Sequence, residues 1–265
     1  MHAEFTFQLA TIYGFLLVLA RVSGVIVFVP IPGFSAGPDM SRALLAVALT
    51  IALLPAWPSH VFSGSLDGST GPLALGKLLG WMGVEAAIGL TIGVAIAFLL
   101  EALQMAAQIL GFQAGYSYAS TIDPSTQADT TTLQLMAQLL AGMLFFAFGL
   151  DRQVLHVLAN SLEWPANGIL PSQGPAAEAI IRLGSLVFST GLQLAIPVLA
   201  LLVLLDVAFA VLGRLHAQMQ LLTLSFAVKM LVGIAFLATI LSLYPGVFAR
   251  SAERTFTTLG GLFHN

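Results

Sequence analysis

The chain has 265 residues, of which 58% are hydrophobic and 8% charged, against about 45–50% and about 25% in soluble domains. Nine basic and twelve acidic residues cannot supply a soluble surface for a chain of this length, which indicates a membrane environment. The net charge of -3 without a basic patch argues against a nucleic-acid partner, and the lack of cysteine excludes disulfides and thiolate metal sites.

Six apolar segments approach the length of about 20 residues that a bilayer requires. They cover approximately residues 9–29, 43–57, 78–100, 133–150, 183–212 and 221–243. The alternation of a membrane β-barrel is missing, so we predict an all-α membrane protein with about six hydrophobic helices. No basic residue precedes the first segment, and we interpret it as a retained helix rather than a cleaved signal peptide.

Small residues form a regular pattern in the third segment. Gly89, Gly93 and Ala97 recur at every fourth position, and Gly76 and Gly80 have the same spacing just upstream. This spacing predicts a helix face that approaches a neighbouring helix closely. The alternative is that Gly and Ala are simply common in membrane helices.

Two ionisable residues fall at matched positions in the last two apolar segments. If this hairpin turns near residues 217 and 218, Asp206 lies eleven residues before the turn and Lys229 eleven residues after it. Both would then lie about 16 Å from the tip at the rise of an α-helix. We prefer an ion pair that holds the hairpin together, with a transport role as the alternative.

Two further charges, Arg21 and Glu85, lie in the earlier apolar segments, and Glu101 follows directly after the third. Arg21 has no partner in its own hairpin, which predicts a contact with another helix, another subunit or a water-filled lumen. Glu85 and Glu101 are sixteen residues apart, or roughly 160° around a straight helix. They therefore cannot form a catalytic carboxylate pair on one face.

The motifs of common enzymes are missing. The sequence has no G-x-S-x-G elbow, no H-E-x-x-H and no phosphate-binding glycine loop. We expect no enzyme activity, no cofactor and no metal. A small-solute transporter is a stronger alternative, although transporters interrupt helices at corresponding places in two halves, and the interruption at 111–131 has no counterpart.

The stretch GFQAGYSYASTIDPSTQADTT, residues 111–131, is polar and almost uncharged between two apolar segments. Glycines give it flexibility, two tyrosines add amphipathic rings, and I-D-P marks a turn. It is either a segment that lines a lumen at membrane depth or an ordinary external loop. The candidate residues are Gly111, Phe112, Gln113, Gly115, Tyr116, Ser117, Tyr118, Ile122, Asp123 and Pro124.

The same stretch carries a family resemblance. The order G-F-Q-A-G, Ser117, I-D-P and Gln127, together with PIPGF after the first helix, FSTGLQLAIPVLALLVLLDVAFAVLGRLHAQMQ and the final L-Y-P, resembles the FliR family of flagellar biosynthetic proteins. The likeness covers essentially the whole chain. The related injectisome family, SctT, shares the architecture, but the wording of these motifs is more similar to the flagellar branch.

This resemblance implies a non-catalytic subunit of the flagellar type III export gate in the bacterial inner membrane, at the flagellar basal body. Such a subunit joins FliP-like and FliQ-like subunits around a pore for unfolded proteins, with FlhB-like and FlhA-like proteins nearby and lipid around them. Residues 1–178 would be FliP-like and 179–265 a FliQ-like hairpin. The loop at 111–131 would plug the pore, and Arg21, Asp206 and Lys229 would serve assembly.

Overall fold

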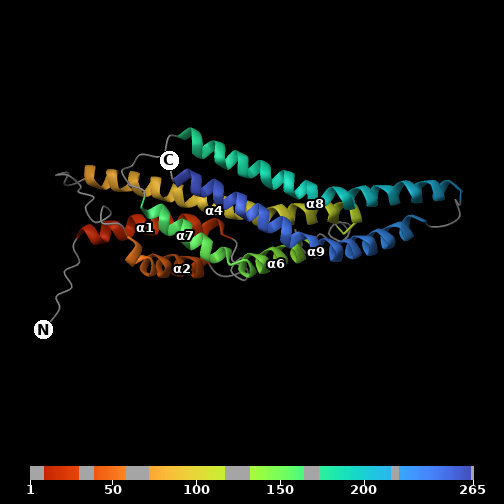
Figure 1. Ribbon diagram of the computed structural model, residues 1–265, viewed down its shortest axis with the longest axis horizontal. Coiled ribbons are helices and arrows are strands. Elements are labelled where there is room, and N and C mark those ends of the chain that lie inside the picture. Colours follow the sequence, from red (N-terminus) through yellow and green to blue (C-terminus); the bar gives the residue numbers. More distant parts are fainter. Residues whose placement is uncertain are drawn as a thin grey trace. The chain divides into compact units, whose positions relative to one another are not determined.

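The fold is entirely helical over the residues that the computed structural model describes. These residues are 9–29, 39–57, 72–116, 132–163, 173–215 and 221–263. The elements are α1 (Leu9–Phe28), α2 (Asp39–Ala52), the 3-10 turn η1 (Leu54–Ala56), α4 (Pro72–Ala114), α6 (Thr132–Ala147), α7 (Leu150–Leu162), α8 (Gln173–Leu215) and α9 (Leu221–Phe263) (Figure 1). The prediction of an all-α membrane fold is confirmed.

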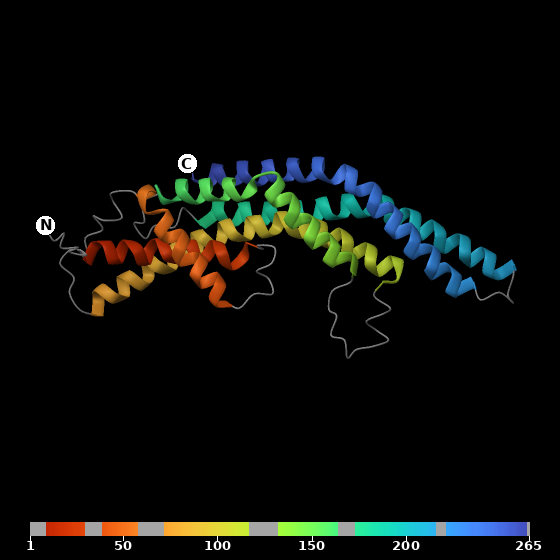
Figure 2. The ribbon, with the colours of Figure 1, turned by 90° about the horizontal axis from the view of Figure 1, so that it is seen from below.

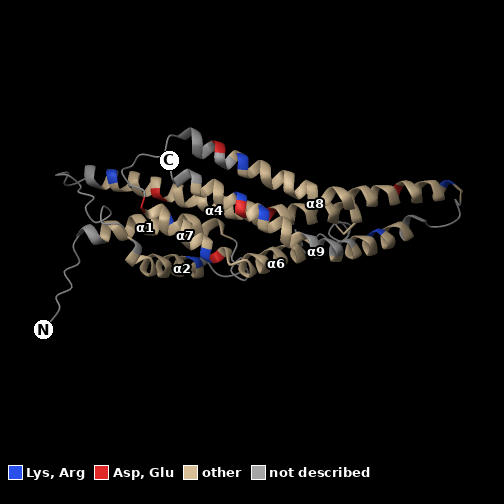
Figure 3. Cartoon of the chain, viewed as in Figure 1, with Lys and Arg blue, Asp and Glu red and all other residues tan. Residues whose placement is uncertain are grey.

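The predicted apolar segments form the centres of longer helices. The segment predicted at 78–100 lies within α4, and those at 183–212 and 221–243 lie within α8 and α9, each of which has 43 residues. Hydropathy ends a segment at the first polar residues, whereas the helical hydrogen bonds continue through them. Charged residues are correspondingly sparse along the described helices (Figure 3).

Among the described residues, two helices are long and apolar enough to cross a membrane: α4 over Leu75–Ala114 and α8 over Ile181–Leu215. A third candidate arises if the broken pair α6 and α7 counts as one span. Ile12–Phe28, Met40–Ala52 and Leu224–Ala235 are shorter apolar helical stretches. All six predicted segments therefore coincide with helices, of which two or three reach spanning length.

The chain divides into two compact units. The first contains Met1–Ala97, Gly149–Leu183 and Glu253–Asn265, and the second contains Phe98–Phe148 and Gly184–Ala252. The long helices α4, α8 and α9 each contribute residues to both units. Figure 2 shows the course of these helices, coloured by residue number. The predicted division after residue 178 falls inside α8 and rests on the family resemblance, so it stays a prediction.

In the first unit, α1 packs against α4 through glycines on both helices. A Cβ atom added at Gly24 would lie 2.6 Å from the carbonyl oxygen of Ala86, and one added at Gly89 would lie 2.0 Å from that of Arg21. At Gly93 the added atom would be 2.7 Å from the carbonyl oxygen of Val25. Real Cβ atoms do not tolerate such distances, so this packing requires glycine.

The remaining small residues of α4 lie in different surroundings. Ala97, at the end of the first unit, is half-buried. Gly76 and Gly80 have nothing within 4 Å of an added Cβ. The regular spacing therefore continues along α4, but among the glycines of this pattern only Gly89 and Gly93 have neighbouring backbone close enough to exclude a side chain.

Replacing Gly89 with alanine is expected to destabilise the first unit, whereas Gly80→Ala on the same helix is not. Overpacking costs about 1–3 kcal/mol, and Gly80→Ala should be neutral or stabilise the helix by up to about 1 kcal/mol. Thermal unfolding of the detergent-solubilised chain measures both. Equal melting temperatures for the two variants would contradict the close approach of α1 and α4.

Candidate functional site

The second unit contains the described part of the 111–131 stretch, which is the C-terminal end of α4. Helix α4 continues past Gly111 to Ala114. Gly115 then adopts a left-handed conformation with φ of 87°. The Gly115 N–H donates to the Phe112 carbonyl at 3.2 Å, and the Tyr116 N–H donates to the Gly111 carbonyl at 2.9 Å.

These two hydrogen bonds form a Schellman motif, in which a left-handed residue satisfies the last carbonyls of a helix. Glycine is the residue that adopts this conformation without strain. A Cβ atom at Gly115 would also lie 2.9 Å from Cδ1 of Phe226 on α9. Backbone conformation and packing therefore both require Gly115 at this position, which fixes where α4 ends.

Polar contacts hold this helix end on α8 and α9. Gln113 Nε2 donates to Asp206 Oδ2 on α8 at 2.9 Å. The other carboxylate oxygen of Asp206 accepts from Lys229 Nζ on α9 in an ion pair. The side chain of Lys229 is 11% exposed and that of Asp206 38%. The structure thus brings together the two charges that the hairpin geometry paired, and adds Gln113 to them.

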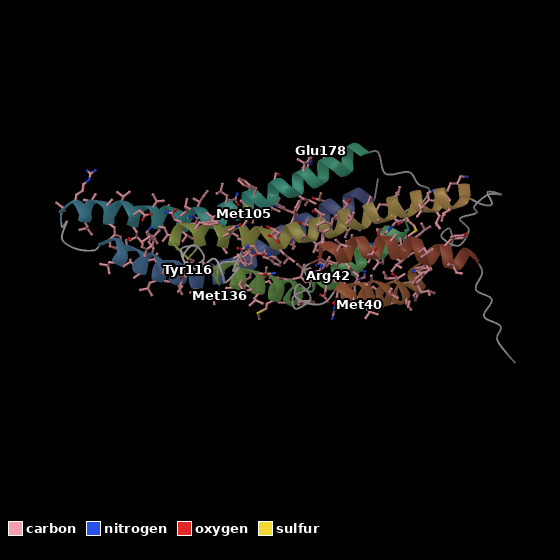
Figure 4. The ribbon with its side chains drawn as sticks, turned by 180° about the vertical axis from the view of Figure 1, so that it is seen from behind. Met40, Arg42, Met105, Tyr116, Met136 and Glu178 are labelled. Atoms are coloured by element: carbon pink, nitrogen blue, oxygen red, sulfur yellow. The ribbon has the colours of Figure 1, made fainter. Side chains whose placement is uncertain are left out.

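Contacts with α9 also hold the C-terminal end of α4 in place. Tyr116, labelled in Figure 4, donates its hydroxyl to the Met230 carbonyl at 3.0 Å. The ammonium of Lys229 lies 5.6 Å from the ring centre of Phe226, within the range of a cation–π interaction. Gly233 leaves room for Ala114 and the Tyr116 ring, which lie 3.5 and 3.8 Å from the position of an added Cβ.

The other residues of the predicted stretch differ in what the structure says of them. Phe112 projects from the seat and is 63% exposed. Ser117, Tyr118, Ile122, Asp123 and Pro124 lie outside the described residues. The site that the structure describes is therefore the root of the stretch, residues 111–116, together with its seat on Asp206, Phe226, Lys229, Met230 and Gly233.

A second polar cluster lies in the first unit around Arg21. Its Nε donates to the carboxylate of Glu85 on α4, and its Nη1 donates to the carbonyl of Ser161 and, at 3.3 Å, to the Ser161 hydroxyl. The Ser161 hydroxyl donates to the Leu158 carbonyl at 2.7 Å. Arg21 and Glu85 are only 1% and 3% exposed.

This cluster joins three helices. Ser161 is in the last turn of α7, where carbonyl groups lack partners within the helix, and Arg21 supplies one of the missing donors from α1. Arg21 therefore meets other helices, one of the three environments that the sequence allowed. Sequence reasoning missed its partner Glu85. A usable signal was present, because Arg21 and Glu85 are opposite charges that lie in two different apolar segments.

Both clusters position helices, and neither is arranged for metal chemistry. The described residues hold no group of three His, Asp or Glu side chains that could bind a metal ion. The charged groups of each cluster pair with one another, and Arg21 also donates to the Ser161 carbonyl. Their geometry suits a fixed contact between helices.

Comparison with known proteins gives the class of protein. Residues 12–255 match the model of the family described as bacterial export proteins, family 1. Because the match covers nearly the whole chain, the chain belongs to this family of bacterial export proteins. The resemblance found in the sequence motifs is confirmed.

Curated relatives narrow the comparison. The chain is 29% identical to the flagellar biosynthetic protein FliR of Escherichia coli K12 over 229 residues, which is 85% of this chain and 83% of that protein. It is 26% identical to the FliR of Caulobacter vibrioides, covering 87% of this chain and 89% of the relative. The surface presentation of antigens protein SpaR of Salmonella typhimurium is 27% identical, with 85% and 81% covered.

Proposed function

We propose that the chain is a non-catalytic subunit of the flagellar type III protein export gate. In this proposal it resides in the bacterial inner membrane at the flagellar basal body and forms part of a helical pore for unfolded flagellar proteins. The observation that carries the proposal is the family match over residues 12–255, joined by FliR relatives that align over most of their length.

The seat of the helix end on α8 and α9 supports a plug at residues 111–131. The Schellman motif and the hydrogen bonds of Gln113 and Tyr116 fix the point where this stretch leaves α4. Beyond Tyr116, uncharged polar side chains dominate the stretch up to residue 131. A fixed root and a mostly uncharged polar continuation suit a segment that occludes the pore at rest and gives way to a passing polypeptide.

The proposed partners are FliP-like, FliQ-like, FlhB-like and FlhA-like subunits, with residues 1–178 as the FliP-like part and 179–265 as the FliQ-like hairpin. Affinity purification of the tagged chain in detergent tests this directly. FliP-like and FliQ-like subunits should co-purify with it in stable amounts. A chain that stays monomeric under these conditions would overturn the proposal.

Deleting residues 117–121 should leave assembly intact and make the closed gate leak small ions. The deletion removes part of the proposed plug but none of the contacts at the root of the stretch. Ion conductance of membranes that contain the purified complex measures the leak. A deletion of equal length at 63–67, in another stretch of the sequence that contains Gly and Ser, is the matched control and should stay tight.

An assembled 117–121 deletion complex that stays as tight as the wild type would identify the stretch as a simple connector. A complex that fails to assemble would assign it a structural role instead. Either result would contradict the assignment of this stretch as a plug. The assignment of the chain as an export-gate subunit would still be tested by co-purification.

An injectisome export subunit is the second candidate. It is favoured by the likeness to SpaR, which covers 85% of this chain, the same share as the likeness to the Escherichia coli FliR. Complementation separates the two: restored motility in a flagellar mutant supports the flagellar assignment, and restored effector secretion in an injectisome mutant supports the other. The match to an export family leaves the solute-transporter alternative without a supporting observation.

A further inference from the structure

The exposed side of α4 in the second unit carries a carboxylate in apolar surroundings. Glu101 lies within Leu75–Ala114, a stretch apolar enough to cross a membrane, and is exposed. Its polar contact within the described chain is the Gln104 side chain, whose Nε2 donates to it at 3.2 Å. Over the described residues, neither Lys nor Arg forms an ion pair with Glu101.

This situation differs from that of four other charges in the apolar helices. Arg21 pairs with Glu85, and Asp206 pairs with Lys229. A carboxylate that faces hydrocarbon is unfavourable, and acidic residues in membrane helices therefore face protein or water. Lipid is accordingly the wrong neighbour for Glu101, and the described part of the chain supplies no cation.

The neighbours of Glu101 on α4 favour protein over water. Phe98, Glu101, Met105, Gln108 and Phe112 follow one another at spacings of three and four residues, the pattern of a seam between packed helices. Phe112 is 63% exposed, and burying an aromatic ring in a protein contact is more favourable than leaving it in water. A mixed row of large apolar and polar side chains is instead typical of an interface between subunits.

Helix α8 covers one edge of this row and leaves the other edge uncovered. A Cβ atom added at Gly184 would lie 3.6 Å from the Phe98 ring, and one added at Gly191 would lie 3.3 Å from the Met105 sulfur. Glu101, Gln108 and Phe112 stay exposed beside them. The uncovered edge therefore has room for one more helix along the seam.

We propose that Glu101, Gln108 and Phe112 form a docking stripe for a helix of a neighbouring export-gate subunit that places a Lys or Arg opposite Glu101. The proposal rests on the proposed function, because it needs an assembly of several membrane subunits. Opposite charge identifies the chemistry of the partner, and the apolar members of the seam supply the packing. The polar pair fixes the register, as single polar residues do in helix seams.

Assembly of the complex tests the charge. We expect Glu101→Lys to lower the amount of co-purified partner subunit at least tenfold and Glu101→Gln to lower it less, because glutamine keeps the shape and loses the charge. Glu178→Gln is the matched control, since Glu178 is an exposed carboxylate near the start of α8 (Figure 4). It should assemble like the wild type. Wild-type yields for Glu101→Lys would overturn the proposal.

A single cysteine tests what covers the stripe, because the chain has none of its own. Gln108→Cys should be protected from a membrane-impermeant maleimide in the assembled complex and react with it in the detergent-isolated chain. A benzophenone attached at this cysteine should form a photoadduct with a partner subunit. Rapid labelling in the complex would show a water-lined face, and adducts with lipid alone would show a lipid face; each overturns the proposal.

The experiments distinguish failure of the proposed function from failure of the docking-stripe proposal. A wild-type chain that captures no membrane partner overturns the export-gate assignment before any variant is compared. A wild-type chain that assembles, with Glu101→Lys assembling equally well, overturns the docking stripe alone.

Discussion

Replacing Arg21 with leucine is expected to destabilise the first compact unit by about 3–5 kcal/mol, the usual cost of removing one partner from a buried ion pair. The Glu85 carboxylate, 3% exposed, would lose its cation, and the Ser161 carbonyl at the end of α7 would lose its donor. Three helices lose a shared contact at once. Thermal unfolding in detergent, followed by size-exclusion chromatography, measures the loss.

Arg182→Leu is the matched control for this experiment. Arg182 pairs with Glu178 one helical turn away, but the two side chains are 74% and 62% exposed. Exposed pairs contribute about 0–1 kcal/mol, so this variant should melt near the wild type. Equal melting temperatures for the Arg21 and Arg182 variants would show that the buried pair contributes no more stability than the exposed pair.

Removing both partners should cost less than removing one. The double variant Arg21→Leu with Glu85→Leu leaves no unpaired charge in the interior, and buried pairs replaced by apolar residues are often tolerated. We expect it to recover part of the stability that Arg21→Leu loses. A double variant that is less stable than either single variant would assign the stability to separate contacts instead of to the pair.

Asp206→Ala is expected to have the largest effect on the second unit. The change leaves the Lys229 ammonium, 11% exposed, without its counter-ion and removes the acceptor of Gln113. The helix end then loses its hold on α8, and the yield of assembled complex should fall. Lys229→Ala added to Asp206→Ala should restore part of the yield, because no unpaired charge remains.

Asp206→Asn separates the charge from the hydrogen bond. Asparagine can still accept from Gln113 but cannot neutralise Lys229, so a defect close to that of Asp206→Ala would identify the ion pair as the main contribution. Gln113→Ala should have a smaller effect, because the ion pair remains. Equal yields for Asp206→Ala alone and for the double variant would show that assembly does not depend on the pairing of Asp206 with Lys229.

Helix positions were predictable from the sequence because apolar residues are so concentrated, but helix ends were not. The segment predicted at 221–243 continues to Phe263 through Pro245, Arg250 and Glu253. Helix α7 was missed altogether, because it places Asp151, Arg152 and Gln153 in its first turn. Hydropathy measures lipid compatibility, whereas a helix needs only continued backbone hydrogen bonds and packing on one side.

Pairings were predictable where the chain folds back directly on itself. Asp206 and Lys229 could be matched by counting from a hairpin tip. Arg21 and Glu85 are 64 residues apart and come from helices whose neighbours no local pattern specifies. The seat of Gln113 and Tyr116 on α8 and α9 was equally inaccessible, because it depends on how distant helices pack.

The apolar part of α8 is longer than the bilayer is thick. Its 35 residues from Ile181 to Leu215 extend about 50 Å at the rise of an α-helix, whereas the hydrocarbon core measures about 30 Å. Only 17% of its most apolar window is buried within the chain. If α8 crossed the membrane perpendicular to its plane, roughly 20 Å of its apolar length would therefore extend into water. We therefore expect other chains to cover this surplus, and the isolated protein to aggregate in their absence.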